Sequence, residues 1–335
     1  MARYKHPSNT FNPSFRDSCK LPMVLAFALL ISAGCANISS RTIGLAGAGQ
    51  YVISGDQVFP EGVAIDPASR RVYATSTETG TIYAGSLNSR TLYVLDEGTL
   101  SSANGVEVLA SGRLGVAGGR SGRLAILDAQ GGVDGVFAVP GEGEPFLNDM
   151  VAVGSQLYVT DSFRPILYRL DLADAMNDEA AESGELDAWL DLRSTPVSYE
   201  EGFNLNGIVT SPDGTALIVA QTNAQRFFRI DLADKRVELI EVAPQRGGAD
   251  GLFRSGDLIY AVKDGGLNVF QVSDEGARMD FKGRIEDPRF KGPTAVTVID
   301  GRAIVTNAQL DAREGKPDLP FTLVSLELPS WATAK

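Results

Sequence analysis

The segment Leu205-Asn-Gly-Ile-Val-Thr-Ser-Pro-Asp-Gly214 begins with a pattern that recurs along the sequence, and this recurrence indicates the fold. The six openings are Glu61-Gly-Val-Ala-Ile-Asp, Asn104-Gly-Val-Glu-Val-Leu, Asn148-Asp-Met-Val-Ala-Val, Asn206-Gly-Ile-Val-Thr-Ser, Asp250-Gly-Leu-Phe-Arg-Ser and Pro293-Thr-Ala-Val-Thr-Val. Successive openings start 43, 44, 58, 44 and 43 residues apart. A repeat of this length with about four short strands is typical of a propeller blade. The six repeats therefore predict an all-β, six-bladed β-propeller over residues 50–330.

Each opening is followed by a turn and then by a strand-like run. These runs are Arg71-Val-Tyr-Ala-Thr, Gln156-Leu-Tyr-Val-Thr, Ala216-Leu-Ile-Val-Ala, Leu258-Ile-Tyr-Ala-Val, Arg302-Ala-Ile-Val-Thr and the weaker Arg113-Leu-Gly-Val-Ala. Runs rich in Val, Ile and Tyr between turn residues indicate antiparallel sheets. An open β-sandwich also explains alternating strands, but it does not explain six openings in register. The stretch Tyr51 to Ser54 precedes the first opening, and we expect it to add a strand to the last blade and close the ring.

The longest interval contains about 14 extra residues, which fall within residues 173–189. Six acidic residues crowd there: Asp174, Asp178, Glu179, Glu182, Glu185 and Asp187. The spacing that an EF-hand calcium loop requires is absent. Two interpretations remain: a solvated, partly helical loop, and a lid over the site.

The first 36 residues have the order of an export signal. Arg3, Lys5, Arg16 and Lys20 make a basic region, an apolar run follows from Leu21 to Ile31, and small residues end it. The apolar run is too short to span a bilayer. The end of the run, Ser32-Ala33-Gly34-Cys35, resembles a bacterial lipobox, whose Cys carries lipid; ordinary cleavage near Ala36 is the alternative. We therefore expect an exported protein, periplasmic or lipid-anchored to the envelope, with a linker over residues 37–49.

Charge and residue usage exclude several function classes. The formal charge is −12 for the whole chain and −15 without residues 1–35. Nucleic acid is thus an unsuitable partner, because phosphate binding needs clustered Lys and Arg. The single histidine, His6, and both cysteines, Cys19 and Cys35, fall within the predicted signal. The processed chain has no histidine for a Ser-His-Asp system or for the usual zinc site.

The first residues of the openings offer oxygen ligands in register. They are Glu61, Asn104, Asn148, Asn206, Asp250 and Pro293, and the innermost strands of a propeller line one central channel. Converging carboxylates in a channel repel one another, which raises a pKa or requires a cation. Carboxylate and amide oxygens without His or Cys favour a hard cation, and calcium accepts such a protein cage more easily than magnesium. Asn-Gly and Asp-Gly are also hairpin-turn signals, and a turn remains an alternative for Asn104.

The sequence resembles the senescence-marker-protein, gluconolactonase and luciferin-regenerating-enzyme family, and more distantly diisopropylfluorophosphatase, paraoxonase and strictosidine synthase. The matching pieces are Phe59-Pro-Glu-Gly-Val-Ala-Ile-Asp-Pro, Leu147-Asn-Asp, Leu205-Asn-Gly-Ile-Val-Thr-Ser-Pro-Asp-Gly and Ala249-Asp-Gly-Leu. The resemblance covers about residues 50–328. It implies one central calcium ion held by Glu61, Asn148, Asn206 and Asp250, with Asp250 as general base in the hydrolysis of a lactone or related ester.

The sequence also departs from this family. Sugar lactonases of the family often have Arg where this chain has Phe146, which favours a more apolar small-molecule substrate contacted by Asn104, Phe146 and Asn148. Two hypotheses follow: a calcium-dependent lactonase or esterase, and a non-enzymatic propeller that calcium stabilises and that binds a ligand or protein. The complete set of oxygen ligands favours the enzyme, whereas Phe146 and the lack of a histidine base favour the binding protein.

Overall fold

The computed structural model describes residues 49–175, 183–243 and 247–334. The predicted export signal, the Cys35 lipobox and the linker up to residue 48 lie outside the described residues. Within the described ranges, no helix has both the length and the apolar character needed to cross a membrane.

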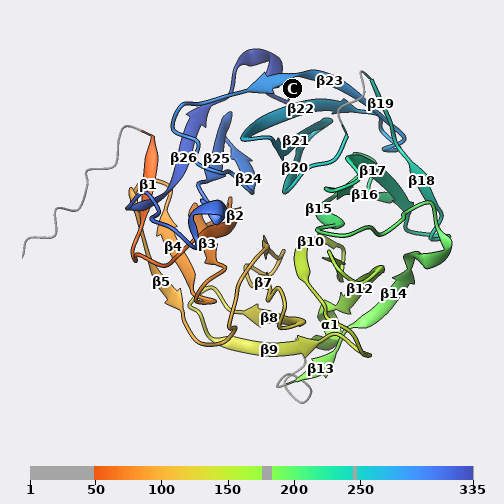
Figure 1. Cartoon of the computed structure of the whole chain (residues 1–335), viewed down its shortest axis with the longest axis horizontal. Coiled ribbons are helices and arrows are strands. Elements are labelled where there is room, and N and C mark those ends of the chain that lie inside the picture. The colour runs from red at the N-terminus through yellow and green to blue at the C-terminus, as the bar shows by residue number, and fades with distance from the viewer. Residues whose placement is uncertain (1–48, 176–182, 244–246, 335) are drawn as a thin grey trace, which may run out of the picture. The chain divides into compact units, whose positions relative to one another are not determined.

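The described chain forms a ring of six antiparallel blades around a central axis (Figure 1), two of which β1 joins into one eight-stranded sheet, and this confirms the predicted six-bladed β-propeller. Blade 1 consists of β2 (Pro60–Asp66), β3 (Arg71–Ser76), β4 (Ile82–Ser86) and β5 (Thr91–Asp96). Blade 2 consists of β6 (Val106–Val108), β7 (Leu114–Ala117), β8 (Arg123–Leu127) and β9 (Val133–Ala138). Blade 3 consists of β10 (Leu147–Val153), β11 (Gln156–Asp161), β12 (Ile166–Asp171) and β14 (Asp187–Asp191).

The other three blades repeat this order from the axis outward. Blade 4 consists of β15 (Leu205–Thr210), β16 (Ala216–Gln221), β17 (Arg226–Asp231) and β18 (Val237–Leu239). Blade 5 consists of β20 (Leu252–Ser255), β21 (Leu258–Lys263), β22 (Gly266–Val272) and β23 (Arg278–Ile285), with β19 (Glu241–Ala243) parallel to β23. Blade 6 consists of β24 (Val296–Ile299), β25 (Arg302–Thr306), β26 (Phe321–Glu327) and β1 (Gln50–Ile53).

The ring is closed by the N-terminal strand, as the sequence predicts. β1 pairs antiparallel with β26, from Gln50 opposite Val324 to Ile53 opposite Phe321. The same strand pairs in parallel with β5 of blade 1, where Val52 lies opposite Thr91. Residues from both ends of the described chain therefore share one blade.

The core is divided among the interfaces between blades. Each of the six interfaces buries one cluster of aliphatic and aromatic side chains. Between blades 2 and 3, for example, Leu124 and Phe137 pack with Leu147, Val159 and Tyr168. Burial of this apolar surface is the main force that holds neighbouring blades together.

The described part of the insertion lies at the outer edge of the ring. It contains the short helix α1 (Leu172–Ala175) and β13 (Gly184–Glu185), and β13 pairs in parallel with β9, the outermost strand of blade 2 (Figure 1). These residues fit the partly helical loop and do not cover the central channel. Residues 176–182, the rest of the insertion that the loop and lid interpretations concern, lie outside the described residues.

Candidate functional site

The predicted ligands lie at the start of the inner strands, at one end of the channel. Glu61, Asn148 and Asn206 each fall within a shift of register between the inner strand and its neighbour. Such β-bulges commonly re-aim side chains next to functional sites. Asp250 lies two residues before the start of β20. Side chains from blades 1, 3, 4 and 5 thus come from equivalent places in the fold.

A closed ring of hydrogen bonds fixes the backbone at these positions. In each blade one carbonyl oxygen, in the inner strand or two residues before it, accepts a hydrogen bond from a donor on the preceding blade, at 2.5–3.0 Å. The acceptors are the carbonyl oxygens of Glu61, Asn104, Asn148, Asn206, Asp250 and Thr294. The donors, in the same order, are Thr294 Oγ1, Thr75 Oγ1, Gly105 N, Thr160 Oγ1, Gly207 N and Gly251 N. We call this set the carbonyl ring.

The glycines of the openings allow the backbones of neighbouring blades to come close together. A Cβ atom on Gly105 would lie 2.5 Å from the carbonyl oxygen of Asn148, and one on Gly207 would lie 2.6 Å from that of Asp250. Neither glycine has a positive φ, whereas the two-residue hairpin turn that Asn-Gly favours requires it. The turn alternative for Asn104-Gly105 is therefore wrong.

The amide of Asn148 is oriented by a buried serine. Its Nδ2 donates to Ser162 Oγ at 3.0 Å, and Ser162 Oγ donates to the carbonyl oxygen of Leu205 at 2.6 Å. The other amide atom, Asn148 Oδ1, is buried and has no hydrogen-bond partner among the described residues. A buried acceptor in this state is unfavourable by roughly 1–3 kcal/mol, which a cation or donor at that point would offset.

The amide of Asn206 contacts a predicted ligand directly. Its Nδ2 donates to Asp250 Oδ1 at 2.8 Å. Burial raises the pKa of Asp250 to about 7, and this hydrogen bond opposes the rise. Burial, and then the charges of Asp250 and Asp149, raise the pKa of Glu61 well above its ordinary value, with Arg313 acting in the opposite sense. The two carboxylates therefore lie near each other in a region short of positive charge.

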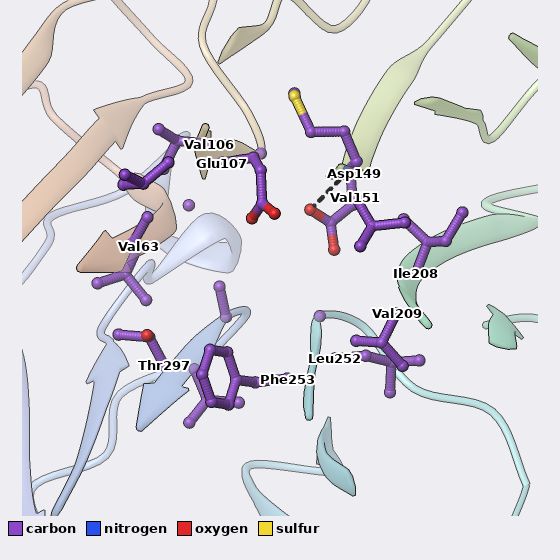
Figure 2. Close-up of a pocket in the computed structure, with 18 of the residues that line it drawn as sticks. Val63, Val106, Glu107, Asp149, Val151, Ile208, Val209, Leu252, Phe253 and Thr297 are labelled. Atoms are coloured by element: carbon purple, nitrogen blue, oxygen red, sulfur yellow. Dashed lines mark hydrogen bonds between the residues drawn. The ribbon is translucent and has the colours of Figure 1, made fainter. Parts of the chain in front are cut away.

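Two further acids, Glu107 and Asp149, face the channel beyond the predicted ligands. Figure 2 shows their carboxylates pointing toward one another. A cavity of about 400 Å³ runs along all six inner strands and includes both residues. Burial, then the charge of Asp149, raises the pKa of Glu107 to about 8; burial likewise raises the pKa of Asp149 to about 7. Much of the remaining wall is apolar, with Val63, Leu252 and Phe253 among the lining residues.

The sequence analysis missed three charged residues near the predicted ligands. Asp149 occupies the second place of its opening, where four of the other five have Gly, and Glu107 is the only acid at the fourth place. These irregularities in the repeat were available as signals. Arg313 lies in the loop between β25 and β26, outside the repeated openings. Its positive charge opposes the rise in the pKa of Glu61, and its guanidinium stacks over Phe59 at 5.8 Å.

Asn104 and Phe146, the other predicted substrate contacts, lie outside the wall of the channel cavity. The buried Asn104 accepts a hydrogen bond from Ser102 Oγ at 3.3 Å through Oδ1. Phe146 is half-buried and contacts Phe163 and Phe203, with ring centroids 5.1 and 5.0 Å away. We call these three residues the phenylalanine cluster. The roles of Asn104 and Phe146 in substrate binding remain predictions.

The donor set fits a hard cation with mixed ligands. Across the described residues, no three Asp, Glu, His or Cys side chains converge closely enough to hold a metal ion by themselves. The four predicted ligands instead combine two carboxylates with two amides, which supply oxygen ligands of the kind calcium takes. The partnerless Asn148 Oδ1 and the raised pKa values of Glu61 and Asp250 are consistent with such a site.

Comparisons with known proteins identify the fold. No protein-family model matches the sequence, and no curated protein matches it. Among solved structures, a gluconolactonase from Xanthomonas campestris is 19% identical, with a TM-score of 0.58 over 84% of this chain and 89% of its own. The calcium-binding protein regucalcin from Agrobacterium tumefaciens is 17% identical, with a TM-score of 0.56 over 83% and 97%. The major allergen Mala s 1 of Malassezia sympodialis is 13% identical, with a TM-score of 0.60 over 84% and 97%. At these identities the likeness shows the shared fold alone.

Proposed function

We propose that this protein is a calcium-dependent hydrolase of lactones or related esters. The observation that carries the proposal is the set of four side chains on the carbonyl ring: Glu61, Asn148, Asn206 and Asp250. The likeness of the fold to a gluconolactonase and to regucalcin supports the same reading. We further propose that the chain is exported, which mass spectrometry of its mature N-terminus tests: an intact Met1 would contradict export.

Glu61, Asn148, Asn206 and Asp250 would hold the calcium ion. When bound, calcium would supply Lewis-acid polarisation of the substrate carbonyl. Asp250 takes a proton from the attacking water, and Asn206 Nδ2 holds Asp250 Oδ1 in place at 2.8 Å. The water oxygen adds to the carbonyl carbon, the bond between that carbon and the ester oxygen breaks, and the proton passes from Asp250 to the leaving alkoxide. The products are a hydroxyl group and a carboxylic acid.

The first experiment is thermal unfolding of the purified protein with calcium, with chelator, and after calcium or magnesium is added back. A ligand that binds only the folded state stabilises it by about 2.7 kcal/mol at 100 times its dissociation constant. For a chain of this size we expect a rise in melting temperature of roughly 5 °C. The rise should be larger for calcium than for magnesium and should vanish in Glu61→Gln. The exposed residue Glu97 provides a matched control, Glu97→Gln, which should keep the rise.

Asp250→Asn separates turnover from metal binding. Asn retains one oxygen ligand but cannot take the proton, so a screen of lactones and esters should lose turnover while part of the calcium-dependent rise persists. Persistent turnover in this variant would contradict the assignment of the base. A calcium-dependent rise in wild type without cleavage of any lactone or ester would instead favour the non-enzymatic, calcium-stabilised propeller.

A further inference from the structure

The phenylalanine cluster lies at the same end of the channel as the predicted ligands. Phe146 precedes Asn148 by two residues, and Phe203 precedes Asn206 by three. Phe163 follows β11, which runs antiparallel to β10, so it returns to the end where Asn148 lies. The channel cavity extends in the opposite direction, along the inner strands beyond the ligands. The cluster therefore lies at the ligand end of the inner strands, on the side away from this cavity.

The cluster is partly open to solvent. Phe203 is 44% exposed, and Phe146 and Phe163 are half-buried. The three ring centroids lie 5.0–5.4 Å apart at tilted or edge-to-face angles. Arg120 stacks its guanidinium over Phe163 at 4.8 Å and over Phe146 at 5.8 Å. Exposed aromatic surface of this kind gains free energy when an apolar group covers it.

Buried polar groups hold two of the three phenylalanine segments in one arrangement. Oδ1 of Asp161, a fully buried residue, accepts hydrogen bonds from the backbone N–H groups of Phe146, Phe163 and Arg164, each at 2.9 Å. Ser162 N donates to the carbonyl oxygen of Phe146 at 2.9 Å. The same Ser162 orients Asn148. The positions of the rings and of a predicted metal ligand are thus coupled through one residue.

A second buried polar residue, Asn204, fixes the loop that carries Phe203. Asn204 Oδ1 accepts from Glu200 N, Gln221 Nε2 and Asn223 Nδ2 at 2.9–3.1 Å. Its Nδ2 donates to the carbonyl oxygens of Ser162, Glu200 and Gly202 at 2.9–3.2 Å. Phe203 is therefore held exposed by a well-satisfied amide rather than left so by a loose loop. Pre-organisation of this kind lowers the entropic cost of binding.

We propose that the phenylalanine cluster binds the apolar substituent of a neutral lactone or ester whose carbonyl reaches the ligand set. This inference rests on the proposed function and names its substrate class. Glu61, Asp149 and Glu107 line the channel, and Glu144 Oε2 lies 3.6 Å from Arg120 Nη1, so a neutral substrate suits this site better than an anionic one. A sugar lactone gains little from three aromatic rings compared with an alkyl or aryl lactone.

The test is a series of γ-lactones with no substituent, then methyl to pentyl substituents, together with glucono-δ-lactone. Each methylene that the rings cover should raise kcat/KM about fourfold in wild type. Phe203→Ala and Phe163→Ala should flatten this dependence on chain length, and Phe203→Leu should restore part of it. Tyr93→Ala, which removes a 64% exposed ring from the outer strand β5, should leave the whole series unchanged.

A binding experiment separates failure of this inference from failure of the proposed function. Calorimetry with 2-alkylcyclopentanones, which are neutral and cannot be hydrolysed, should show affinity that rises with chain length in wild type and not in Phe203→Ala. That result without turnover would support the subsite and contradict the hydrolase. Turnover with no dependence on chain length would overturn the subsite and leave the hydrolase. If the protein showed no turnover and no binding, both the subsite and the hydrolase would be overturned.

Discussion

Replacing Glu107 by Gln is expected to stabilise the calcium-free protein, and the gain should grow with pH. Gln keeps the oxygen that accepts from Ala152 N at 3.4 Å and removes the charge. Burial, then the charge of Asp149, raises the pKa of Glu107 from 4.5 to about 8. Below pH 4.5 the carboxyl is protonated in both the folded and the unfolded chain, so wild type and variant should be equally stable there.

The gain opens as the pH rises. Between pH 4.5 and 8 the unfolded chain loses this proton while the folded protein keeps it, so wild type loses stability with increasing pH. At 1.36 kcal/mol for each pKa unit, the difference between variant and wild type should be about 3 kcal/mol at pH 6.5. It should level off at about 5 kcal/mol above pH 8.

Urea unfolding in chelator from pH 4.5 to 9, followed by fluorescence and circular dichroism, measures this difference. The slope of unfolding free energy against urea should match in the two proteins, so that the midpoints report stability. Glu97→Gln, on an exposed loop, should follow wild type within about 0.5 kcal/mol. Parallel pH profiles for wild type and Glu107→Gln would show that Glu107 ionises freely, and would refute the interaction of the two channel acids, Glu107 and Asp149.

Two further variants test the architecture of the site and of the ring. Ser162→Ala leaves Asn148 Nδ2 and the carbonyl oxygen of Leu205 without their buried partner. The free energy of unfolding should fall by about 2 kcal/mol or more, and the calcium-dependent rise in melting temperature should be smaller. Ser155→Ala, at an exposed position, should show neither effect. Ile53→Ala removes a fully buried side chain from β1 and should lower the free energy of unfolding by about 2–5 kcal/mol. Val133→Ala, at a half-exposed outer position, should change it little. Equal losses in the two variants would contradict the role of β1 in closing the ring.

The repeat was sufficient to predict the blades because each inner strand faces the same environment. The expected second strand Arg302 to Thr306 has the observed bounds of β25, and the run from Gln156 to Thr160 is one residue short of β11. Register along the chain becomes register around the axis only in a closed repeat. For that reason the four predicted ligands could be assigned to one end of the channel without knowledge of any distance.

The remaining parts of the site could not be predicted because they depend on side chains that break the repeat or come from loops. Glu107 and Asp149 each break the repeat once, and this irregularity marks the two positions without showing that their carboxylates point toward one another in the channel. The phenylalanine cluster joins the start of β10 to the loops after β11 and before β15. The contacts of Ser162 with Asn148 and Leu205 depend on the rotamer of one buried hydroxyl, which no periodicity encodes.

The carbonyl ring would link stability to the proposed function of this propeller. Its hydrogen bonds join every blade to the next, and the side chains proposed to hold calcium belong to the same residues as four of its six acceptors. A cation bound by blades 1, 3, 4 and 5 would add a second constraint to blades that the carbonyl ring and β1 already hold. Its binding free energy would then appear mainly as protection against separation of the blades. Because the carbonyl ring holds these backbones whether or not the carboxylates are neutralised, the acids remain close together, and relief of their mutual repulsion would supply the affinity for the proposed cation.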